Sequence, residues 1–228
     1  MDTHRNNETT QDVYLGSLLC VSGLATSCVN RRLGEARASF LKIQRVWKHA
    51  HVSKRRKVEI YMSCIVSKLL YSLECECLRA ADRTRINGFH CRCLRTICKI
   101  PHSMISHITN AEVLTIAGVP LLTTLIDKKQ LLLYGRVASQ PHDSGMRAAI
   151  FHPGTVQPKL LQNSRRRGRP RISWIGIQHA RALELAGGCQ TDLNAIFLNS
   201  IEASKRWQCL VNDQFSVRSG LVHVCIYR

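Results

Sequence analysis

The sequence predicts a mainly α-helical protein, with a short β segment at its start, a helical bundle in its middle and a smaller helical part at its end. Apolar residues recur at steps of three and four over most of the chain, which is typical of helices with one buried face. Capping residues, glycines and prolines separate these stretches. The chain has 228 residues, 45% of them hydrophobic, which is enough to bury a core in one domain or in two small ones.

Residues 1–12 are polar and predict no element. Residues 13–30 are rich in Val, Leu, Ser and Cys, with Gly16 and Gly23 between them, and predict one or two short strands or a hairpin. The apolar spacing then predicts a helix from residue 31 to about residue 50. Its buried stripe consists of Leu33, Ala36, Phe40, Ile43 and Trp47. Its opposite face is basic and carries Arg31, Arg32, Arg37, Lys42, Arg45 and Lys48, against Glu35.

A second helix is expected after Ser53, whose side chain suits an N-cap. The residues on its buried side are Val58, Tyr61, Ile65 and Leu69. Its first turn, residues 54–57, places four cations at the positive end of the helix dipole, which destabilises the helix by about a few tenths of a kcal/mol per charge. A bound phosphate chain would offset this effect. The alternative is a solvated basic turn, because salt screens exposed charges.

Three further helices are expected before residue 140. The first begins with Asp82 as its N-cap, ends before Pro101 and has a basic exposed side. Its buried residues are Ile86, Phe89, Cys93 and Ile97. The next begins at a capping box formed by Thr109 and Glu112 and ends at Gly118. The last runs from about residue 121 to residue 139.

Residues 140–170 are predicted to be a linker, because they hold several prolines and glycines and a run of arginines. The spacing beyond them predicts helices over 172–185 and 200–211, with two glycines between the pair. The expected domains are therefore a loose N-terminus with a strand or hairpin over 1–30, a helical domain over 31–139, the linker over 140–170 and a small helical region over 171–228.

The charge of the chain points to a polyanionic partner. It has 33 Lys and Arg against 15 Asp and Glu, a formal net charge of +18. Such an excess repels itself in a compact protein, and nucleic acid is the partner that best explains it, ahead of an acidic membrane surface. No apolar run approaches the roughly 20 residues of a membrane span, so no membrane partner is expected.

The cysteines and the N-terminal region predict an intracellular protein. The 11 cysteines are odd in number and several stand at apolar positions of helical patterns, which is typical of reduced, buried thiols. The uncharged residues 15–29 follow Asp2, Glu8 and Asp12, and this negative charge is the wrong sign for a secretory signal. We expect the nucleus rather than the cytoplasm.

Several short motifs occur in a characteristic order. They are Tyr14-Leu15-Gly16-Ser17, Arg32-Leu33-x-x-Ala36-x-x-x-Phe40 with Trp47, Leu69-Leu70-Tyr71-x-x-Glu74, Cys93-Leu94-Arg95, Tyr134-Gly135-Arg136-Val137-Ala138, and Gly168-Arg169-Pro170-x-x-x-Trp174. This order resembles the region downstream of the catalytic palm in reverse transcriptases of non-LTR (LINE-type) retrotransposons. The resemblance covers about residues 13–174.

The resemblance implies a thumb-like bundle with a connecting region after it, and a β remnant that closes the palm. Intact relatives would be RNA-directed DNA polymerases that hold the template and the growing strand against the palm. The chain departs from the family pattern at Ser72 and Glu76, which replace a glycine and a tryptophan, and at Gly135–Ser139, which lacks a histidine and an arginine. A decayed retroelement product without selected function is therefore an alternative.

Catalysis is not expected from this chain. Nucleotidyl transfer needs paired carboxylates that hold two metal ions, and the sequence contains no adjacent pair of aspartates. The palm would lie before Met1. We therefore expect a non-catalytic fragment, without a cofactor, that binds RNA or DNA phosphates largely independently of sequence. The residues expected to contact phosphates are Arg31, Arg32, Lys42, Arg45, Lys48, Lys54, Arg55, Arg56, Lys57, Arg165, Arg166, Arg167 and Arg169.

Short motifs elsewhere in the chain suggest three other kinds of site. Arg167-Gly168-Arg169-Pro170 resembles the core of an AT-hook, so a stand-alone DNA-binding module that prefers A·T-rich duplex is an alternative. A zinc site in the Cys75–Cys98 region is not expected, because cysteines two apart on a helix diverge by roughly 200°. Adjacent His90 and Cys91 do not face each other on a helix either, which argues against a nucleophile–base pair. Histidines such as His49, His51 and His179 are interpreted as surface or packing residues.

Overall fold

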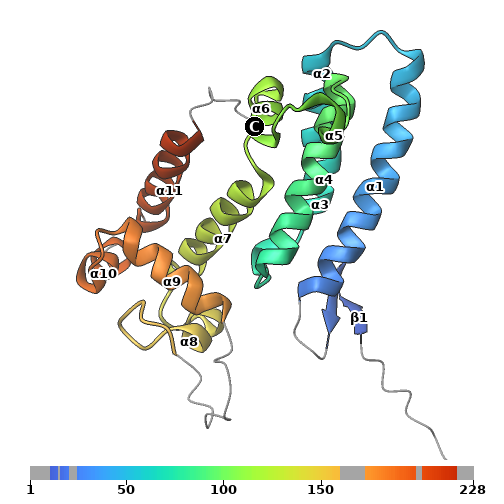
Figure 1. The fold of residues 1–228 in the computed structure, drawn as a ribbon. Helices are drawn as coiled ribbons and strands as arrows, with labels where there is room; N and C mark the ends of the chain where they lie inside the picture. Colours follow the sequence, from blue (N-terminus) through green and yellow to red (C-terminus); the bar gives the residue numbers. More distant parts are fainter. Residues whose placement is uncertain (1–10, 15, 21–24, 160–172, 199–201, 220–228) are drawn as a thin grey trace, which may run out of the picture. The chain divides into compact units, whose positions relative to one another are not determined.

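The computed structural model describes residues 11–14, 16–20, 25–159, 173–198 and 202–219. These residues are mainly α-helical, with a two-stranded antiparallel sheet near the start and helices at the end, which confirms the predicted fold class (Figure 1). The chain forms two compact units, which we call unit 1 (Met1–Val113) and unit 2 (Leu114–Arg228).

Unit 1 begins with the predicted hairpin. Strand β1 (Gln11–Tyr14) pairs with β2 (Ser17–Cys20) in antiparallel register, with Tyr14 opposite Ser17. Helix α1 (Ala25–His49) starts at Ala25, six residues before the predicted start at Arg31. The prediction was wrong there because Ala25, Cys28 and Val29 are buried and extend the apolar stripe toward the N-terminus.

The second predicted helix is confirmed in its start and in its buried side. Helix α2 (Lys54–Ile60) continues without a break into a π-helical segment η1 (Tyr61–Val66) and α3 (Ser67–Leu70). The Ser53 hydroxyl accepts a hydrogen bond from the Arg56 backbone N–H, so Ser53 is the N-cap. The stripe residues Val58, Tyr61, Ile65 and Leu69 are all buried.

Helix α4 (Ala80–Cys98) follows a short 3-10 turn η2 (Leu73–Cys75) and packs against α1 and α2. Its N-cap is Arg79, so the prediction of Asp82 as the cap was wrong. Asp82 lies in the first turn, is 2% exposed, and accepts a hydrogen bond from the Thr26 hydroxyl at 3.1 Å. This aspartate therefore ties α4 to α1, a contact that no local pattern reveals.

A capped loop follows α4. It contains α5 (Ser103–Ser106) and leads into α6 (Asn110–Ala117). The capping box before α6 is confirmed: the Thr109 hydroxyl accepts from the Glu112 backbone N–H, and the Glu112 carboxylate accepts from the Thr109 backbone N–H at 2.6 Å. Gly118 then takes a left-handed φ of 68°, which ends the helix as predicted.

Unit 2 is built on α7 (Leu122–Ala138), which packs against α9 (Trp174–Leu185) and α11 (Ala203–Ser219). Helices α8 (Gly145–Ile150) and α10 (Gln190–Leu198) complete its described part. Tyr134, Phe197 and Trp207 form the aromatic centre of its core, with ring centroids 5.2 to 6.3 Å apart.

The domain boundary differs from the expected one. The sequence places residues 121–139 with the preceding helices, but α7 packs with α9 and α11 instead. The described part of the expected linker is not a free connection: Phe151 and Val156 are buried in the core of unit 2. Arg147 is 3% exposed and donates to the carbonyls of Gln140 and Thr155 at 3.4 Å. The prediction of a linker rested on the proline and glycine content of this segment, and that composition does not show which of its residues are buried.

Within the described ranges, no single helix has the length and apolar composition needed to cross a membrane. Helices α6 and α7 meet that test only as a pair, with a bend of 70° between them.

Candidate nucleic-acid interface

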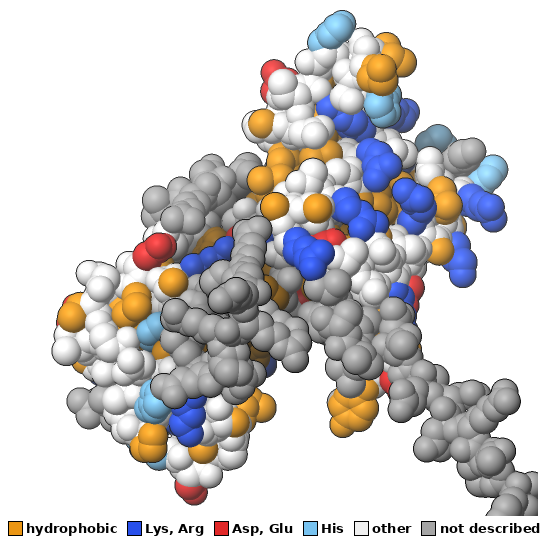
Figure 2. Space-filling view, turned by 60° about the horizontal axis from the view of Figure 1, so that its bottom comes forward, with side chains coloured by type: hydrophobic (Ala, Val, Ile, Leu, Met, Phe, Trp, Pro, Cys, Tyr) orange, Lys and Arg blue, Asp and Glu red, His pale blue; other side chains and the backbone are white. Residues whose placement is uncertain are grey.

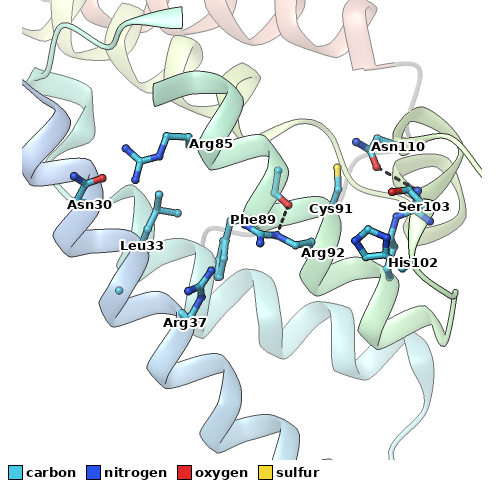
Figure 3. A pocket seen from close by; sticks show the side chains of 13 residues that line it. Asn30, Leu33, Arg37, Arg85, Phe89, Cys91, Arg92, His102, Ser103 and Asn110 are labelled. Carbon is cyan, nitrogen blue, oxygen red and sulfur yellow. Dashed lines mark hydrogen bonds between the residues drawn. The ribbon is translucent and has the colours of Figure 1, made fainter. Parts of the chain in front are cut away.

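A solvent-open groove of about 480 Å³ lies on unit 1 between α1 and α4 (Figure 3). We call it the arginine groove, after the four arginines that line it, namely Arg37, Arg85, Arg92 and Arg95. Arg37 comes from α1 and the other three come from α4. His102 and Ser103, from the loop after α4, lie at one end of the groove, and Asn30 lies at the other.

The groove is cationic and carries no acidic side chain among its lining residues. Arg37 and Arg92 are exposed, and neither forms an ion pair within the described part of the chain. The Arg92 Nε–H donates to the carbonyl of Gly88 at 3.3 Å, which holds this guanidinium along the groove. Arg85 lies 3.9 Å from the Asp82 carboxylate, a long contact. Figure 2 shows Lys and Arg side chains gathered on unit 1 with few acidic side chains among them. Positive potential therefore concentrates in this groove.

Two glycines within helices line the arginine groove. A Cβ on Gly34 of α1 or on Gly88 of α4 would meet no atom within 4 Å, and neither residue has a left-handed φ. Glycine inside a helix is less stable than alanine by roughly 0.5–1 kcal/mol, and here neither packing nor backbone geometry requires it. Because both positions lack a side chain, they leave open space at the groove, where a ligand can approach the two helices closely.

Arg95 fixes one end of the groove. It is 6% exposed, and its guanidinium donates to the carbonyl of Pro101 and the hydroxyl of Ser106, both at 3.1 Å, and to the carbonyl of Ile108 and the side-chain oxygen of Asn110. All of these partners are neutral. The buried cation therefore holds the loop after α4 in place and adds positive charge that no carboxylate offsets at the groove.

The structure removes Arg32 from the expected interface. This side chain is 6% exposed, it donates to the Gly16 carbonyl and to Glu35, and its guanidinium lies 4.8 Å from the centroid of the Tyr71 ring. The prediction of a phosphate contact was wrong because Arg32 joins α1 to the hairpin and to the segment after α3. Its neighbour Arg31 also pairs with Glu35, at 3.0 Å.

Neither Lys42 nor Arg45, which are also expected to contact phosphates from α1, lines the groove. Lys42 and Arg45 are exposed, but Lys42 lies about 140° around the helix from Arg37, at about 100° per residue. The side chain of Lys48 is outside the described residues. Arg37 is thus the residue through which α1 supplies charge to the arginine groove.

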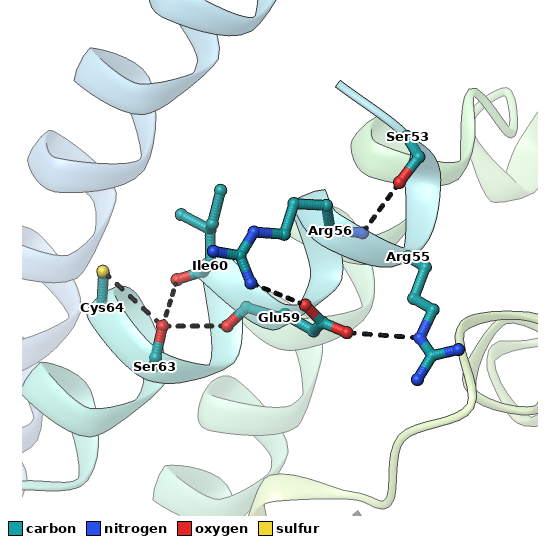
Figure 4. A network of polar contacts seen from close by, with 7 residues as sticks. All are labelled: Ser53, Arg55, Arg56, Glu59, Ile60, Ser63 and Cys64. Atoms are coloured by element: carbon teal, nitrogen blue, oxygen red, sulfur yellow. Dashed lines mark hydrogen bonds and ion pairs between the residues drawn. The ribbon is translucent and has the colours of Figure 1, made fainter.

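The basic turn, residues 54–57, is exposed at its first three positions and partly neutralised by Glu59. Arg55 and Arg56 both pair with the Glu59 carboxylate, at 3.3 and 3.0 Å (Figure 4). The hydrogen bond from Arg56, followed by that from Arg55, lowers the pKa of Glu59. Exposed ion pairs of this kind contribute little energy, so phosphates can compete for both arginines.

The two lysines of the turn have different surroundings. Burial raises the pKa of the Cys98 thiol, and the positive charge of nearby Lys54 lowers it to a smaller extent. Helix α2, which begins with the basic turn, also packs against α4. Lys57 is only partly exposed, and its ammonium lies 5.9 Å from the centroid of the Trp47 ring. A cation–π contact at that distance leaves the charge accessible.

The arginine run lies outside the described residues. Arg165, Arg166, Arg167 and Arg169, and with them the AT-hook-like sequence, belong to the range 160–172. Their contribution to an interface stays a prediction.

The sequence interpretation missed the pairing of α1 with α4. Arg85, Gly88 and Arg92 are spaced by three and four residues and share one helix face, a signal that was present in the sequence. The sequence predicts that the exposed side of this helix is basic, but it does not show that this face lies opposite Arg37.

The Cys75–Cys98 region forms no metal site. Among the described residues, no three His, Cys, Asp or Glu side chains lie close enough together to bind a metal ion. His90 is fully buried, and its Nδ1 lies 2.9 Å from the Tyr61 hydroxyl. Burial raises the pKa of the Cys91 thiol, and burial also raises the pKa of Cys93 to about 12. Both thiols therefore stay protonated at neutral pH and are poor nucleophiles.

The geometry thus gives a cationic groove with open space at two glycines and a second basic surface at the start of α2. Comparison of the chain with known protein families, with curated proteins and with solved structures finds no match.

Proposed function

We propose that this chain binds nucleic acid without catalysis, by holding phosphates in the arginine groove and on the basic turn, independently of base sequence. The observation that carries the proposal is the lining of the groove. Arg37 and Arg92 line a common space from two helices without an acidic neighbour in the lining, and Gly34 and Gly88 put no side chain into this space. Guanidinium groups and close backbone approach suit a phosphate chain.

The open shape of the groove favours a polymer over a small metabolite. Ligand pockets for small molecules are concave, mostly apolar and bury most of the ligand. The arginine groove is open to solvent, and unit 1 carries a second basic surface, the turn at the start of α2. With a formal net charge of +18 over the whole chain, a polyanion that extends beyond one groove accounts for more of the charge than a single anion does.

We further propose that the chain derives from the thumb and connecting region of a LINE-type reverse transcriptase. The ordered motifs from Tyr14 to Trp174 support this origin, and a helical unit with a basic groove suits a part that grips template and primer. In this setting the chain positions a nucleic acid, and the chemistry belongs to a palm.

The test is binding of a fluorescent DNA duplex and an RNA–DNA hybrid, followed by anisotropy at low salt. Replacing Arg37 and Arg92 by glutamine should weaken binding about tenfold for both duplexes, because two phosphate contacts are lost. Both side chains are exposed and make no ion pair in the described part of the chain, so the fold should be retained.

The matched control carries the same change in charge on unit 2. Arg136 and Lys205 are exposed on α7 and α11, and their replacement by glutamine should change affinity by less than about threefold, through the general field alone. Equal losses in the two double variants would show that net charge, and not the arginine groove, determines binding. A strong preference for A·T-rich duplex would favour the AT-hook alternative.

A further inference from the structure

Two large apolar side chains stand exposed on the loop after α4. Met104 is 84% exposed and Ile105 is 73% exposed, and they are adjacent on the single turn of α5. They directly follow His102 and Ser103, which line the arginine groove. Because consecutive Cα atoms are about 3.8 Å apart, Met104 begins one residue step from the groove lining.

The loop that carries this pair is held firmly. The His102 carbonyl accepts from the backbone N–H groups of Ile105 and Ser106, at 2.9 and 3.0 Å, and the His102 Nδ1 accepts from the Met104 N–H at 3.4 Å. Arg95 also holds this turn in place, because its guanidinium donates to the carbonyl of Pro101 before the turn and to the hydroxyl of Ser106 at its end. The exposed pair is therefore presented on a preorganised turn and is not the tip of a loose loop.

The charges in the segment that carries this pair favour a polyanionic partner. Within residues 99–110 the titratable side chains are Lys99, His102 and His107, and the acidic residue that follows, Glu112, is engaged in the capping box of α6. In the proposed function, the neighbouring arginine groove holds the phosphates of a nucleic acid. Proteins that deform duplexes place apolar side chains such as Met and Ile next to cations that hold the backbone, and insert them between base steps.

We propose, on the basis of the proposed nucleic-acid binding, that Met104 and Ile105 form an apolar wedge that inserts at a base step of a duplex whose backbone lies in the arginine groove. Arg37 and Arg92 hold the phosphates, and α5 directs the two side chains toward the stacked bases. The wedge unstacks or bends the duplex locally, and it adds little to the electrostatic part of the affinity.

The experiment uses the full chain and a duplex with 2-aminopurine at successive positions, because the fluorescence of this base rises when it is unstacked. The wild type should raise the fluorescence at least about twofold at some position, and the Met104→Ala/Ile105→Ala variant should lose most of that rise. Its affinity should change by less than about threefold, and the dependence of affinity on salt should be unchanged.

Two further variants serve as controls. Leu41 and Val46 are also exposed apolar residues of unit 1, on α1, and Leu41→Ala/Val46→Ala should leave the fluorescence rise intact. Met104→Leu/Ile105→Leu, which keeps apolar bulk on the turn, should also retain it. Both alanine variants change exposed side chains, so circular dichroism should show the same helix content as in the wild type.

The outcomes separate the two proposals. A wild type that binds duplex without any fluorescence rise, or a rise that survives Met104→Ala/Ile105→Ala, overturns the wedge and leaves the phosphate groove standing. Absence of duplex binding overturns both. Binding to vesicles of phosphatidylserine and phosphatidylcholine that depends on Met104 and Ile105, without base unstacking, would assign the pair to a membrane surface and overturn the wedge.

Discussion

The indole of Trp207 lies directly against the backbone of Gly135, and a Cβ on Gly135 would come within 1.8 Å of the Trp207 Cδ1 atom. The indole N–H of Trp207 donates to the Leu131 carbonyl at 2.7 Å, one turn earlier on α7. Helix α11 therefore packs closely on α7 only because Gly135 has no side chain. Gly34 and Gly88 in unit 1 have no such neighbour, and this contrast separates a packing glycine from the two groove glycines.

The first prediction concerns this contact. Gly135→Ala should destabilise unit 2 by about 1–3 kcal/mol or more, because the new methyl group overlaps a buried ring that is fixed by its hydrogen bond. Chemical denaturation monitored by tryptophan fluorescence measures the effect. Gly145→Ala, at a position where a Cβ would meet no atom within 4 Å, is the control and should change stability much less. Equal stability of Gly135→Ala and the wild type would contradict the close packing of α11 on α7.

The groove glycines give the opposite prediction. Gly34→Ala and Gly88→Ala should each stabilise unit 1 by about 0.5–1 kcal/mol, since alanine is the better helix former and the space is open. The same variants should weaken duplex binding several-fold, because a methyl group keeps the phosphate chain away from the backbone. Thermal unfolding and anisotropy test the two effects on the same samples. Stabilisation with unchanged affinity would show that the glycines do not serve binding.

A pH effect is expected in unit 2. Desolvation by burial lowers the pKa of His179, whose Nδ1 lies 2.9 Å from the hydroxyl of buried Tyr134, while a hydrogen bond with Gln190 raises the pKa less. The unfolded chain therefore binds a proton more readily than the folded one, so stability is complete above about pH 6.5 and falls as the pH drops below it.

The melting temperature of unit 2 should consequently fall between about pH 7.5 and pH 5.5, and His179→Gln should flatten this dependence. The relevant quantity is the difference between the two pH values for each protein, since the substitution also changes stability at a fixed pH. A His179→Gln variant as sensitive to acid as the wild type would assign the effect to other groups.

Cysteine reactivity provides a further prediction. The hydrogen bond between Cys189 and Thr191, at 2.7 Å, and the backbone N–H groups of Thr191 and Asp192 lower the pKa of the exposed Cys189 thiol. Burial raises the pKa of Cys93 to about 12. Iodoacetamide at neutral pH should therefore modify Cys189 quickly and leave Cys93 unmodified in the folded protein. Mass spectrometry of peptides reads out both sites, and labelling of Cys93 before Cys189 would contradict their surroundings.

The sequence predicted those parts of the fold that depend on neighbouring residues. The Ser53 cap and the Thr109–Glu112 capping box follow from spacings of three residues, and both are present. The burial of Tyr61 and Ile65 follows from the helical period. Local patterns of this kind are independent of the rest of the fold, so they could be recognised without it.

Contacts between distant segments account for the errors. Arg32 stands on the basic face of α1, and nothing near it in the sequence shows that the Gly16 carbonyl and the Tyr71 ring cover it. The arginine groove depends on α1 and α4 lying side by side, so its charges were visible in the sequence but their convergence was not. Likewise, Phe151 and Val156 lie in a segment whose composition resembles a linker, although both are buried.

The salt dependence of duplex binding tests the central claim most directly, because each phosphate contact contributes about 0.9 to the slope of log affinity against log salt concentration. The slope should be steep for the wild type and should fall by about 1.8 when Arg37 and Arg92 are replaced by glutamine, two contacts at about 0.9 each. Neutralising the basic turn at residues 54–57 should flatten it as well. A wild-type slope near zero, or a slope that both sets of substitutions leave unchanged, would contradict phosphate binding by these helices.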